Sequence, residues 1–289
     1  MQMAADQDLE QFAERLGDLQ CKTRLRIERE LGSQRGQGHG RSIFRFERSF
    51  DIYKCIRRCL KLVGFWNRAQ RNYLDIQVVR REVVLPGLPD AFDGYTFLQL
   101  SDLHAALHPD FPERVKAVID PLDYDCLVMT GDFRTATFGD HSGATAATID
   151  IVASVEAPIY AILGNHDSLG KVPAMEAAGI RFLLNEHVTL ERSGAAIHLL
   201  GIDDPNFYQT HSLERALDGV PEEGVKILLS HAPQTYALAA EAGVDFLMSG
   251  HTHGGQICLP GGREVVHDGS APRRVLAGAW SEAQLQGYT

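Results

Sequence analysis

Cysteine and long apolar runs are both scarce in this sequence, and each shortage disfavours a class of protein. The five cysteines form an odd, scattered set without the paired spacing of a zinc site. A disulfide-stabilised secreted domain is therefore disfavoured, and a reducing compartment fits best. No apolar run approaches the roughly 20 residues that a transmembrane helix requires. Residues 1–10 are polar and acidic, so we expect no cleaved signal peptide.

Positive charge is scarce after residue 81. The chain carries 28 Lys and Arg against 38 Asp and Glu, a formal charge of −10. Residues 1–81 hold 17 of these cations and 10 of the anions, a balance of +7, so the remainder must carry −17. An acidic remainder suits a domain whose carboxylates bind cations, and it argues against a broad nucleic-acid footprint. We therefore do not expect a nucleic-acid partner.

What the chain does have is a repeated pattern of short apolar runs followed by metal-ligand chemistry. Each run is bounded by turn residues and reads as a buried strand, so the polar residues behind it lie at the strand's carboxyl end. Open α/β sheets place their sites at such ends. The polar residues are Asp102 and His104, Asp132, Asn165 and His166, His231, and His251 and His253. Strands are expected near 96–101, 125–130, 159–163, 197–202, 226–230 and 245–249.

The side chains restrict the kind of metal. Two aspartates, one asparagine and four histidines form an oxygen and nitrogen set without thiolate, which suits manganese, iron or zinc better than copper(I) or an iron–sulfur cluster. Seven ligands exceed the need of one such ion. If one carboxylate bridges, two ions about 3.5 to 4 Å apart can be held, as in phosphatases and nucleases. Phosphoester hydrolysis is the chemistry that best uses such a pair.

Each block has an ordinary explanation when it is taken alone. Asp102 could be a helix N-cap, His231 a satisfied buried histidine, and Asn165 with Asp167 a turn. For the pattern to be accidental, an ordinary explanation must hold for each of the five blocks at once, although they occur in order and at strand ends. Five ordered blocks are a far more specific signal than a lone Asp-x-His.

In this order the blocks resemble the calcineurin-like metallophosphoesterases, whose pattern is D-x-H, G-D, G-N-H-D, H and G-H-x-H. The resemblance covers roughly residues 95 to 289. It implies an α/β fold of the layered α-β-β-α type, with two packed mixed sheets flanked by helices. Gly250 to Gln256, Gly-His-Thr-His-Gly-Gly-Gln, is similar to a bacterial phosphodiesterase branch in which some members act on UDP-2,3-diacylglucosamine.

Carried over residue by residue, the resemblance implies two divalent cations, with manganese favoured over iron or zinc. Asp132 would bridge the two ions. His166 would contact the substrate phosphate and protonate the leaving group, as a histidine can near neutral pH. The remaining ligands divide into Asp102, His104 and His253 for one ion, and Asn165, His231 and His251 for the other.

Some positions depart from the pattern or leave it open. Phe133-Arg134 follows Asp132 where Ser/Thr protein phosphatases have Asp-Arg-Gly, so a phosphoprotein substrate is disfavoured. Arg134 could grip a substrate phosphate with its planar fork, but a surface arginine at the start of a loop is favoured. Residues 201–205 could line the cleft or form an ordinary turn. Family members usually continue beyond residues 286–289 with another turn and strand.

Residues 1–79 are predicted to be a basic helical extension, and residues 80–289 the catalytic domain. Leu9, Phe12, Leu16 and Leu19 recur at helical spacing in the extension. A second helix combines an apolar stripe with a basic face, an arrangement typical of a helix lying on a membrane surface, although helices that dock on a domain share it. The stripe is Ile52, Ile56, Cys59, Leu60, Val63 and Trp66, and the basic face is Lys54, Arg57, Arg58, Lys61 and Arg68.

The sequence therefore predicts a metal-dependent hydrolase of phosphoester bonds. Its expected substrate is a phosphodiester or pyrophosphate in a small molecule or membrane glycolipid such as UDP-diacylglucosamine. Residues 50–72 are expected to contact the membrane surface, which would place the protein in the cytoplasm at the inner face of the membrane. A soluble nucleotide phosphodiesterase is the second hypothesis, and a non-catalytic metal-binding interaction module is the third.

Overall fold

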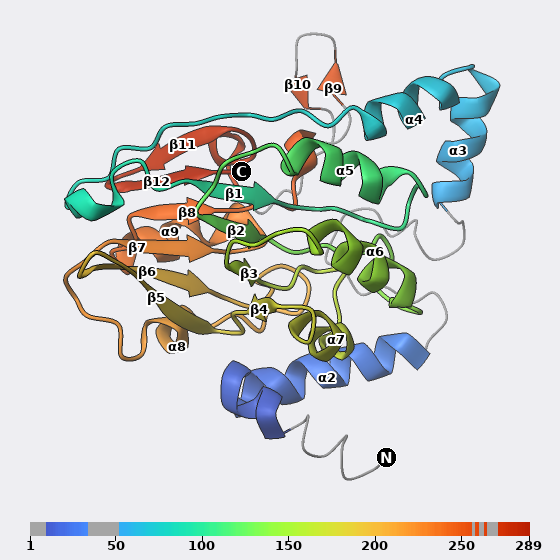
Figure 1. Ribbon diagram of the computed structural model, residues 1–289. Helices are drawn as coiled ribbons and strands as arrows, with labels where there is room; N and C mark the ends of the chain where they lie inside the picture. The colour runs from blue at the N-terminus through green and yellow to red at the C-terminus, as the bar shows by residue number, and fades with distance from the viewer. Residues whose placement is uncertain (1–9, 34–51, 256–257, 260–262, 265–270) are drawn as a thin grey trace.

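A computed structural model describes residues 10–33, 52–255, 258–259, 263–264 and 271–289. Two sheets form the centre of the molecule, and helices cover their outer faces (Figure 1). This is the layered α-β-β-α arrangement expected from the sequence. Within the described ranges, no helix combines the length and apolar composition needed to cross a bilayer.

The first sheet has the order β1-β2-β3-β4, and its neighbouring strands are parallel. Parallel neighbours need a crossover, and helices supply it between successive strands. The strands are β1 (Phe97–Leu100), β2 (Cys126–Met129), β3 (Ile159–Ala161) and β4 (Ile180–Phe182). The helices are α5 (Phe111–Ile119), α6 (Ser142–Val152) and α7 (Val172–Glu176).

The second sheet has the order β11-β12-β8-β7-β6-β5 and is mixed. Its central strands run parallel, and each edge strand pairs antiparallel with its neighbour. The strands are β5 (Glu186–Arg192), β6 (Ala195–Gly201), β7 (Lys226–Leu229), β8 (Phe246–Met248), β11 (Ala279–Glu282) and β12 (Leu285–Tyr288). Residues 285–288 therefore extend this sheet beside β8.

Shorter elements complete the chain around the two sheets. The helices α8 (Leu213–Leu217) and α9 (Tyr236–Glu241) belong to the second half, and β9 (Cys258–Leu259) pairs with β10 (Arg263–Glu264). Short 3-10 turns are η2 (Asp90–Phe92), η3 (Leu169–Lys171), η4 (Pro233–Thr235), η5 (His253–Gly255) and η6 (Arg273–Val275).

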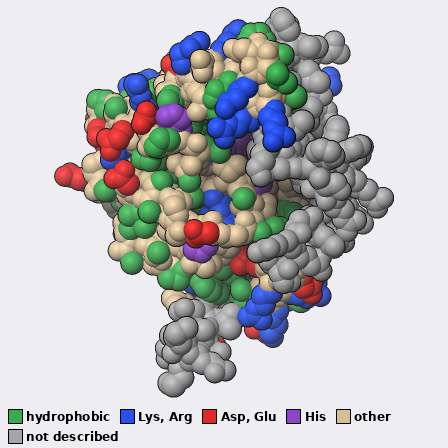
Figure 2. Space-filling view, turned by 90° about the vertical axis from the view of Figure 1, so that its right-hand side faces the viewer, with side chains coloured by type: hydrophobic (Ala, Val, Ile, Leu, Met, Phe, Trp, Pro, Cys, Tyr) green, Lys and Arg blue, Asp and Glu red, His purple; other side chains and the backbone are tan. Residues whose placement is uncertain are grey.

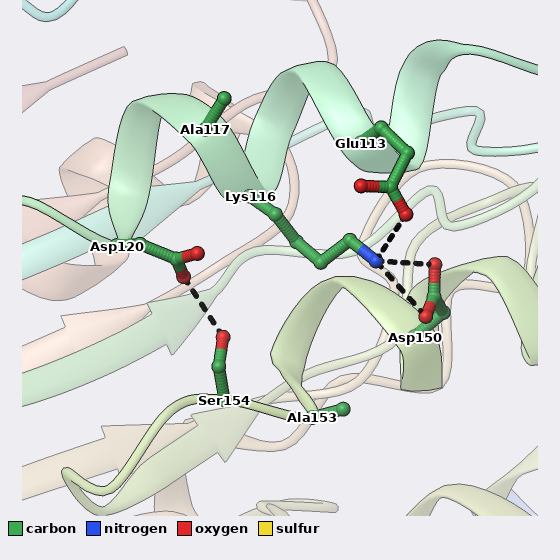
Figure 3. Close-up of a pocket in the computed structure, with 7 residues that line it drawn as sticks. All are labelled: Glu113, Lys116, Ala117, Asp120, Asp150, Ala153 and Ser154. Carbon is green, nitrogen blue, oxygen red and sulfur yellow. Dashed lines mark hydrogen bonds and ion pairs between the residues drawn. The ribbon is translucent and has the colours of Figure 1, made fainter.

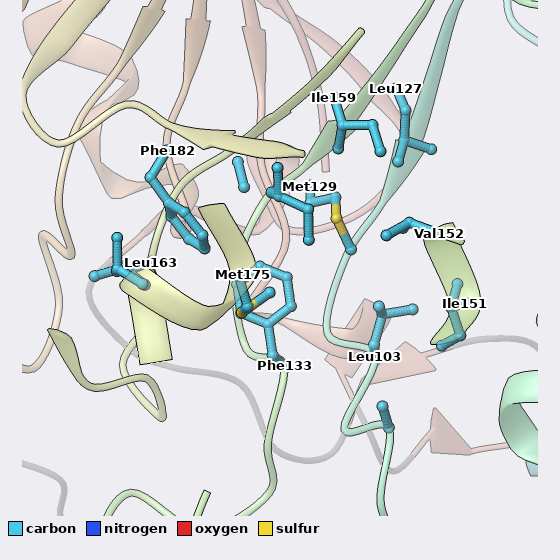
Figure 4. Packing of buried hydrophobic residues seen from close by; sticks show 14 of the residues in the cluster. Leu103, Leu127, Met129, Phe133, Ile151, Val152, Ile159, Leu163, Met175 and Phe182 are labelled. Carbon is cyan, nitrogen blue, oxygen red and sulfur yellow. The ribbon is translucent and has the colours of Figure 1, made fainter. Parts of the chain in front are cut away.

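The core is divided into layers by the alternation of side chains along each strand. On β2, Leu127 and Met129 join the cluster under α5, α6 and α7, whereas Cys126 and Val128 join the cluster between the sheets. On β7, Leu228 faces a third cluster with α9. Successive side chains of a strand point to opposite faces, so a fully apolar strand supplies two layers. Figure 4 shows the first of these clusters.

The N-terminal helices pack against the first core cluster. Phe12 and Leu16 are buried in it with Cys21, from α2 (Asp18–Ser33). A break at Gly17, whose φ is 98°, separates the helical residues 10–16 from α2. The break rotates the apolar stripe, so Leu19, which the spacing placed on it, is 73% exposed. Leu9 lies outside the described residues.

The predicted second helix is two helices joined by a turn. They are α3 (Ile52–Leu62) and α4 (Trp66–Leu74), and Gly64 with a φ of 75° lies between them. Together they form a hairpin, named here the α3–α4 hairpin, that projects from one end of the molecule (Figure 1). Residues 50–51 and the side chains of residues 52–56, which include part of the predicted stripe and basic face, lie outside what the structure describes.

Candidate metal centre

The loops that carry the predicted ligands meet at the carboxyl ends of both sheets. They follow β1, β2 and β3 in the first sheet, and β7 and β8 in the second. The arrowheads of β1, β2 and β7 point to the same side of the molecule (Figure 1). The apolar runs read from the sequence form these strands, so their carboxyl ends bring residues from five separate segments together.

Asp102, His104 and His253 form a first group whose ligand atoms all lie within 4.8 Å of one another. His104 Nε2 lies 3.4 Å from His253 Nε2, and the two rings are stacked. Asp102 Oδ1 lies 3.3 Å from His253 Nε2. That oxygen is buried without a hydrogen-bond partner. A buried carboxylate oxygen left in this state among imidazole nitrogens fits a cation ligand.

Asp132, His231 and His251 form a second group under the same 4.8 Å limit. Asn165 joins it, because its Oδ1 lies 2.9 Å from His231 Nε2. The structure thus brings together all seven residues that the resemblance implied as ligands, in the same two sets. Oxygen and imidazole nitrogen donors of this kind suit a divalent first-row metal.

Asp132 belongs to the second group, is almost fully buried, and also interacts electrostatically with His104 of the first group. Its Oδ2 is 3.3 Å from His231 Nε2 and 3.8 Å from His166 Nε2. Burial by itself raises the pKa of Asp132, but the facing His231, His166 and His104 hold that pKa well below its usual range. Burial would likewise lower the pKa of His231, yet Asp132 raises it to about 10. The pocket therefore favours positive charge beside an ionised carboxylate.

Backbone carbonyls orient two of the histidines. His104 Nδ1 lies 2.9 Å from the carbonyl oxygen of Arg134, and His231 Nδ1 lies 2.7 Å from that of Thr130. When Nδ1–H donates to a carbonyl, the lone pair of Nε2 is free to face a cation. Both rings therefore present the nitrogen that faces the other members of their group.

Backbone strain is concentrated at the same positions. Left-handed φ angles occur at Asp102 (52°), His104 (43°), Asp132 (57°), His251 (70°) and His253 (50°). Residues other than glycine rarely adopt this region, and such strain persists only where surrounding interactions impose it. Its clustering at five of the seven predicted ligands indicates a functional site.

Two motif glycines allow the aspartates to come close. A Cβ atom on Gly164 would lie 2.2 Å from Asp132 Oδ1, and one on Gly250 would lie 2.3 Å from Asp102 Oδ2. Real Cβ atoms do not approach other atoms this closely, so any larger residue would displace the carboxylate. The glycines before Asn165 and His251 therefore serve close packing at the site.

His166 faces this centre from the loop after β3. Its Nδ1 lies 2.8 Å from Thr137 Oγ1, its backbone N–H donates to Asp132 Oδ1 at 2.8 Å, and its Nε2 faces Asp132 Oδ2. Burial lowers the pKa of His166, although the Asp132 carboxylate opposes the shift. The structure thus leaves Nε2 as the ring nitrogen directed to the site.

The interpretation of Arg134 as a surface arginine is wrong, because this side chain is buried. Its guanidinium donates to the carbonyl oxygens of His166 at 2.6 Å and Gly139 at 2.8 Å, and also to that of Thr137. The Arg134 guanidinium, considered above as a group that could bind a substrate phosphate, therefore donates to three backbone carbonyls. Arg134 holds the loop that carries His166's partner Thr137.

Asp167, considered above only as a turn residue, is fully buried and binds the backbone around the ligands. It accepts hydrogen bonds from the N–H groups of Asp132 at 2.7 Å, Phe133 at 3.1 Å and Gly164 at 2.9 Å. The ammonium group of Lys171, also buried, is paired with it. Asp167 therefore fixes the strained backbone at Asp132, a role that the motif Asn165-His166-Asp167 did not reveal.

The segment 201–205 after β6 forms the turn that was one of its two expected roles. Asp204 is buried and accepts the N–H groups of Asn206, Phe207 and Tyr208, as an aspartate does in a turn. The turn places the residue after this segment at the site, because Asn206 Nδ2 lies 2.7 Å from His251 Nε2. Asn206 could not be identified from the sequence, because no residue pattern near it in the sequence indicates a contact with His251.

A surface groove between α5 and α6 is separate from this centre (Figure 3). The charged groups that line it are paired with one another. Lys116 Nζ lies 2.5 Å from Glu113 Oε1 and 3.0 Å from Asp150 Oδ2, and Ser154 Oγ donates to Asp120 Oδ1 at 2.8 Å. Because these charged side chains are paired with one another, we do not assign a catalytic site to this groove.

Comparison with known proteins agrees with this geometry. The calcineurin-like phosphoesterase profile matches residues 95–255, more than half of the chain. The chain is 30% identical over 226 residues to the uncharacterized metallophosphoesterase YkoQ of Bacillus subtilis, covering 74% of this chain and 81% of that protein. It is 30% identical to a transmembrane protein with metallophosphoesterase domain from Danio rerio, covering 68% of this chain and 48% of that protein.

A further relative is phosphodiesterase YaeI of Escherichia coli. It is 25% identical, and the match covers 57% of this chain and 62% of that protein. The family match spans every residue of both ligand groups. This chain belongs to the calcineurin-like phosphoesterase family, whose members are metal-dependent hydrolases of phosphoester bonds.

Proposed function

We propose that the chain is a two-metal phosphodiesterase that acts on a phosphodiester or pyrophosphate of a membrane glycolipid. The observation that supports the two-metal assignment is the presence of two groups of ligand atoms, with Asp132 of the second group interacting electrostatically with His104 and His253 of the first. One group, Asp102, His104 and His253, would hold the first cation. Asn165, His231 and His251 would hold the second, and the Asp132 carboxylate would serve both.

Manganese is the metal we favour, with iron or zinc as alternatives, because the ligands are oxygen and imidazole nitrogen. When bound, a pair of divalent cations supplies positive charge that offsets the phosphate and activates water as the nucleophile. The chain itself holds this charge in place through the buried Asp132, whose backbone is fixed by Asp167.

His166 is the residue that moves a proton to the leaving group. In its protonated form, Nδ1–H donates to Thr137 Oγ1, and Nε2–H faces the site beside Asp132. The Thr137 contact and the three carbonyl bonds of Arg134 keep the ring in this orientation. A positioned acid of this kind can protonate a departing alkoxide or phosphate as the ester bond breaks.

Replacing His166 with alanine is expected to lower turnover of bis(p-nitrophenyl) phosphate by about 10²- to 10⁴-fold, the range of general acid catalysis. Bound metal, measured by mass spectrometry, should stay nearly unchanged because His166 is in neither ligand group. His187→Ala, on the edge strand β5, is the control and should keep wild-type turnover. An inactive metal-loaded wild type would contradict the proposed function, and equal loss of metal and activity in His166→Ala would contradict the role of His166.

Two observations support a membrane glycolipid over a soluble nucleotide. Gly250 to Gln256 resembles the branch that includes UDP-diacylglucosamine hydrolases, although Gln256 lies outside the described residues. The α3–α4 hairpin supplies the second, because residues 52–74 contain six Lys and Arg and no Asp or Glu. The name of the Escherichia coli relative, phosphodiesterase, fits the bond type in either case.

The hairpin presents apolar and basic side chains together. Leu62, Val63 and Phe65 at its turn are 86%, 62% and 54% exposed. Arg57 and Lys61 lie over the Trp66 ring, at 5.1 and 5.7 Å from its centroid. Figure 2 shows hydrophobic and basic side chains gathered at the top of this face. Such a surface matches an anionic lipid bilayer, in which apolar residues enter the interface and cations meet headgroups.

The root of the hairpin lies next to the metal centre. Tyr73, near the end of α4, has its hydroxyl 3.3 Å from the carbonyl oxygens of both Leu103 and His104. Its ring stacks on Phe111 with centroids 4.7 Å apart. A bilayer bound by the hairpin would therefore lie on the side of the molecule where the ligands meet, and we place the protein at the inner face of the cytoplasmic membrane.

Replacing Arg57, Arg58 and Lys61 with glutamine is expected to weaken binding to phosphatidylglycerol vesicles by on the order of 100-fold, since each cation near an anionic surface contributes about a factor of five. Vesicle co-sedimentation at low and high salt measures this. Leu238→Ser, an exposed apolar residue on α9, should leave binding unchanged. If the wild-type protein does not co-sediment with the vesicles, the result would support the soluble nucleotide phosphodiesterase instead.

A further inference from the structure

Two loops beside the metal centre are each held rigid by one buried charged side chain. The guanidinium of Arg134 donates to the carbonyl oxygens of Thr137 and Gly139, the two end residues of the segment 137–139. The carboxylate of Asp204 accepts N–H groups from Asn206 at 3.1 Å and from Phe207 and Tyr208 at 2.7 Å each. Such bonds fix the backbone and therefore the direction of the side chains that these loops carry.

Each loop contacts the centre and carries a phenylalanine next to the contacting residue. Thr137 is bonded to His166, and Phe138 follows it. Asn206 is bonded to His251, and Phe207 follows it. The rings of Phe138 and Phe207 contact each other, with centroids 6.0 Å apart and planes tilted by 58°. The two loops come from different sheets, so this pair joins the loop that contacts His166 to the loop that contacts His251.

Neither phenylalanine is fully buried, although both are large and apolar. A partly exposed aromatic pair near a polar centre can pack against an apolar surface of a bound ligand. The pair is held at its position by bonds on both loops, so little freedom is lost when a ligand binds.

We propose that Phe138 and Phe207 form a subsite for a nucleobase-type planar ring in the ester group of the substrate that stays on phosphorus. The assignment rests on the proposed phosphodiesterase function. Rigid aromatic side chains bind planar rings through their faces, and this stacking tolerates many ring types. The subsite would hold that ring while the phosphate lies among the metal ligands. The ring belongs to the ester group that stays on phosphorus, so its binding would hold the phosphate, and with it the bond to the leaving group, at the centre that His166 and His251 contact.

The test compares three p-nitrophenyl phosphodiesters whose second ester group is thymidine, methyl or octyl. All three release the same p-nitrophenolate, so differences report on the second group. We expect wild-type protein to have a higher kcat/KM for the thymidine ester than for the methyl ester. Phe138→Ala and Phe207→Ala should each reduce this ratio about tenfold, chiefly through KM, as stacking of one ring predicts.

Ring-retaining variants provide the matched controls. Phe138→Tyr and Phe207→Tyr should keep the wild-type ratio, whereas Phe138→Leu and Phe207→Leu should lower it, because leucine is apolar but has no ring. An unchanged ratio in the alanine and leucine variants would overturn the subsite. Selective loss of activity on the octyl ester would also overturn it, because it would identify an acyl-chain site. Wild-type protein that hydrolyses none of the three esters would instead refute the phosphodiesterase function on which the subsite depends.

Discussion

Asp132→Asn is expected to abolish metal-dependent hydrolysis, with a fall in turnover on the order of 10³-fold or more. Asparagine has nearly the same shape but lacks the negative charge that interacts with His231 of the second group and with His104 of the first. Asp132 lies 3.3 Å from His231 and is buried, so water cannot replace that charge. Loss of a shared carboxylate removes the electrostatic support of both cations, which contribute several kcal/mol to the transition state.

The measurement is hydrolysis of bis(p-nitrophenyl) phosphate by metal-stripped protein, before and after manganese is restored. Wild-type activity should return with manganese, whereas Asp132→Asn should stay inactive and bind fewer ions. Asp93→Asn makes the same chemical change on an exposed residue before β1, at the opposite end of the strand, and should behave as wild type. Full activity in Asp132→Asn would remove Asp132 from the centre, and an inactive, folded, metal-loaded wild type would favour the non-catalytic module.

Arg24→Met is expected to reduce the free energy of unfolding by about 3 to 5 kcal/mol, the usual effect of leaving a buried charge without its partner. Arg24 lies on α2 and is fully buried. Its Nη1 lies 2.5 Å from Asp203 Oδ1, and its Nη2 donates to the carbonyl oxygen of Asp167 at 2.8 Å. Burial by itself would lower the pKa of Arg24, but Asp203 raises it above its ordinary value.

The contacts of Arg24 join the N-terminal helix to the metal centre. Asp167, whose carbonyl binds Arg24, holds the backbone N–H of Asp132 with its carboxylate. The guanidinium also lies 3.9 Å from the centre of the Tyr208 ring, in the turn that positions Asn206. Removing Arg24 should therefore loosen two segments around the ligands as well as destabilise the fold.

Urea unfolding of metal-stripped protein measures the effect without the added stability of bound ions. Lys22→Ala, on the same helix but exposed and paired only with Asp18, should leave the midpoint unchanged. In the double variant Arg24→Met with Asp203→Asn, the fully buried charge of Asp203 is no longer left alone, so part of the lost stability should return, although Glu28 still lacks its pair with Arg24. An Arg24→Met midpoint equal to that of wild type would show that α2 does not stabilise the domain through this pair.

The strands that carry the site could be predicted because their signal is local. β1, β2, β3, β7 and β8 each lie within the expected ranges, since a buried strand needs apolar residues on both faces. The antiparallel strands β5, β11 and β12 gave no comparable signal. β5 is half-exposed, and β12 depends on pairing with β8, whose partner residues lie 40 positions earlier in the sequence. Pairing over such a separation is set by the partner strand.

The N-terminal region shows where a local pattern is insufficient. The boundary between residues 79 and 80 stays a prediction, but Phe12, Leu16 and Arg24 contribute to the interior of the domain beyond it. An apolar stripe predicts that a helix packs against something, and it cannot identify the partner. Glycines at positions 17 and 64 divided the expected helices and changed which side chains are exposed.

By itself, the sequence determined the chemistry: which side chains follow which strands, and that their oxygen and nitrogen atoms suit divalent cations. The tertiary structure alone decided how they are held. Asp167 fixes the backbone of Asp132, Arg134 binds three carbonyls around His166, and Arg24 reaches Asp203 from a helix 179 positions away. Ligand identity is a property of a residue and its strand, whereas buried charge pairing depends on which segments the packed sheets bring together.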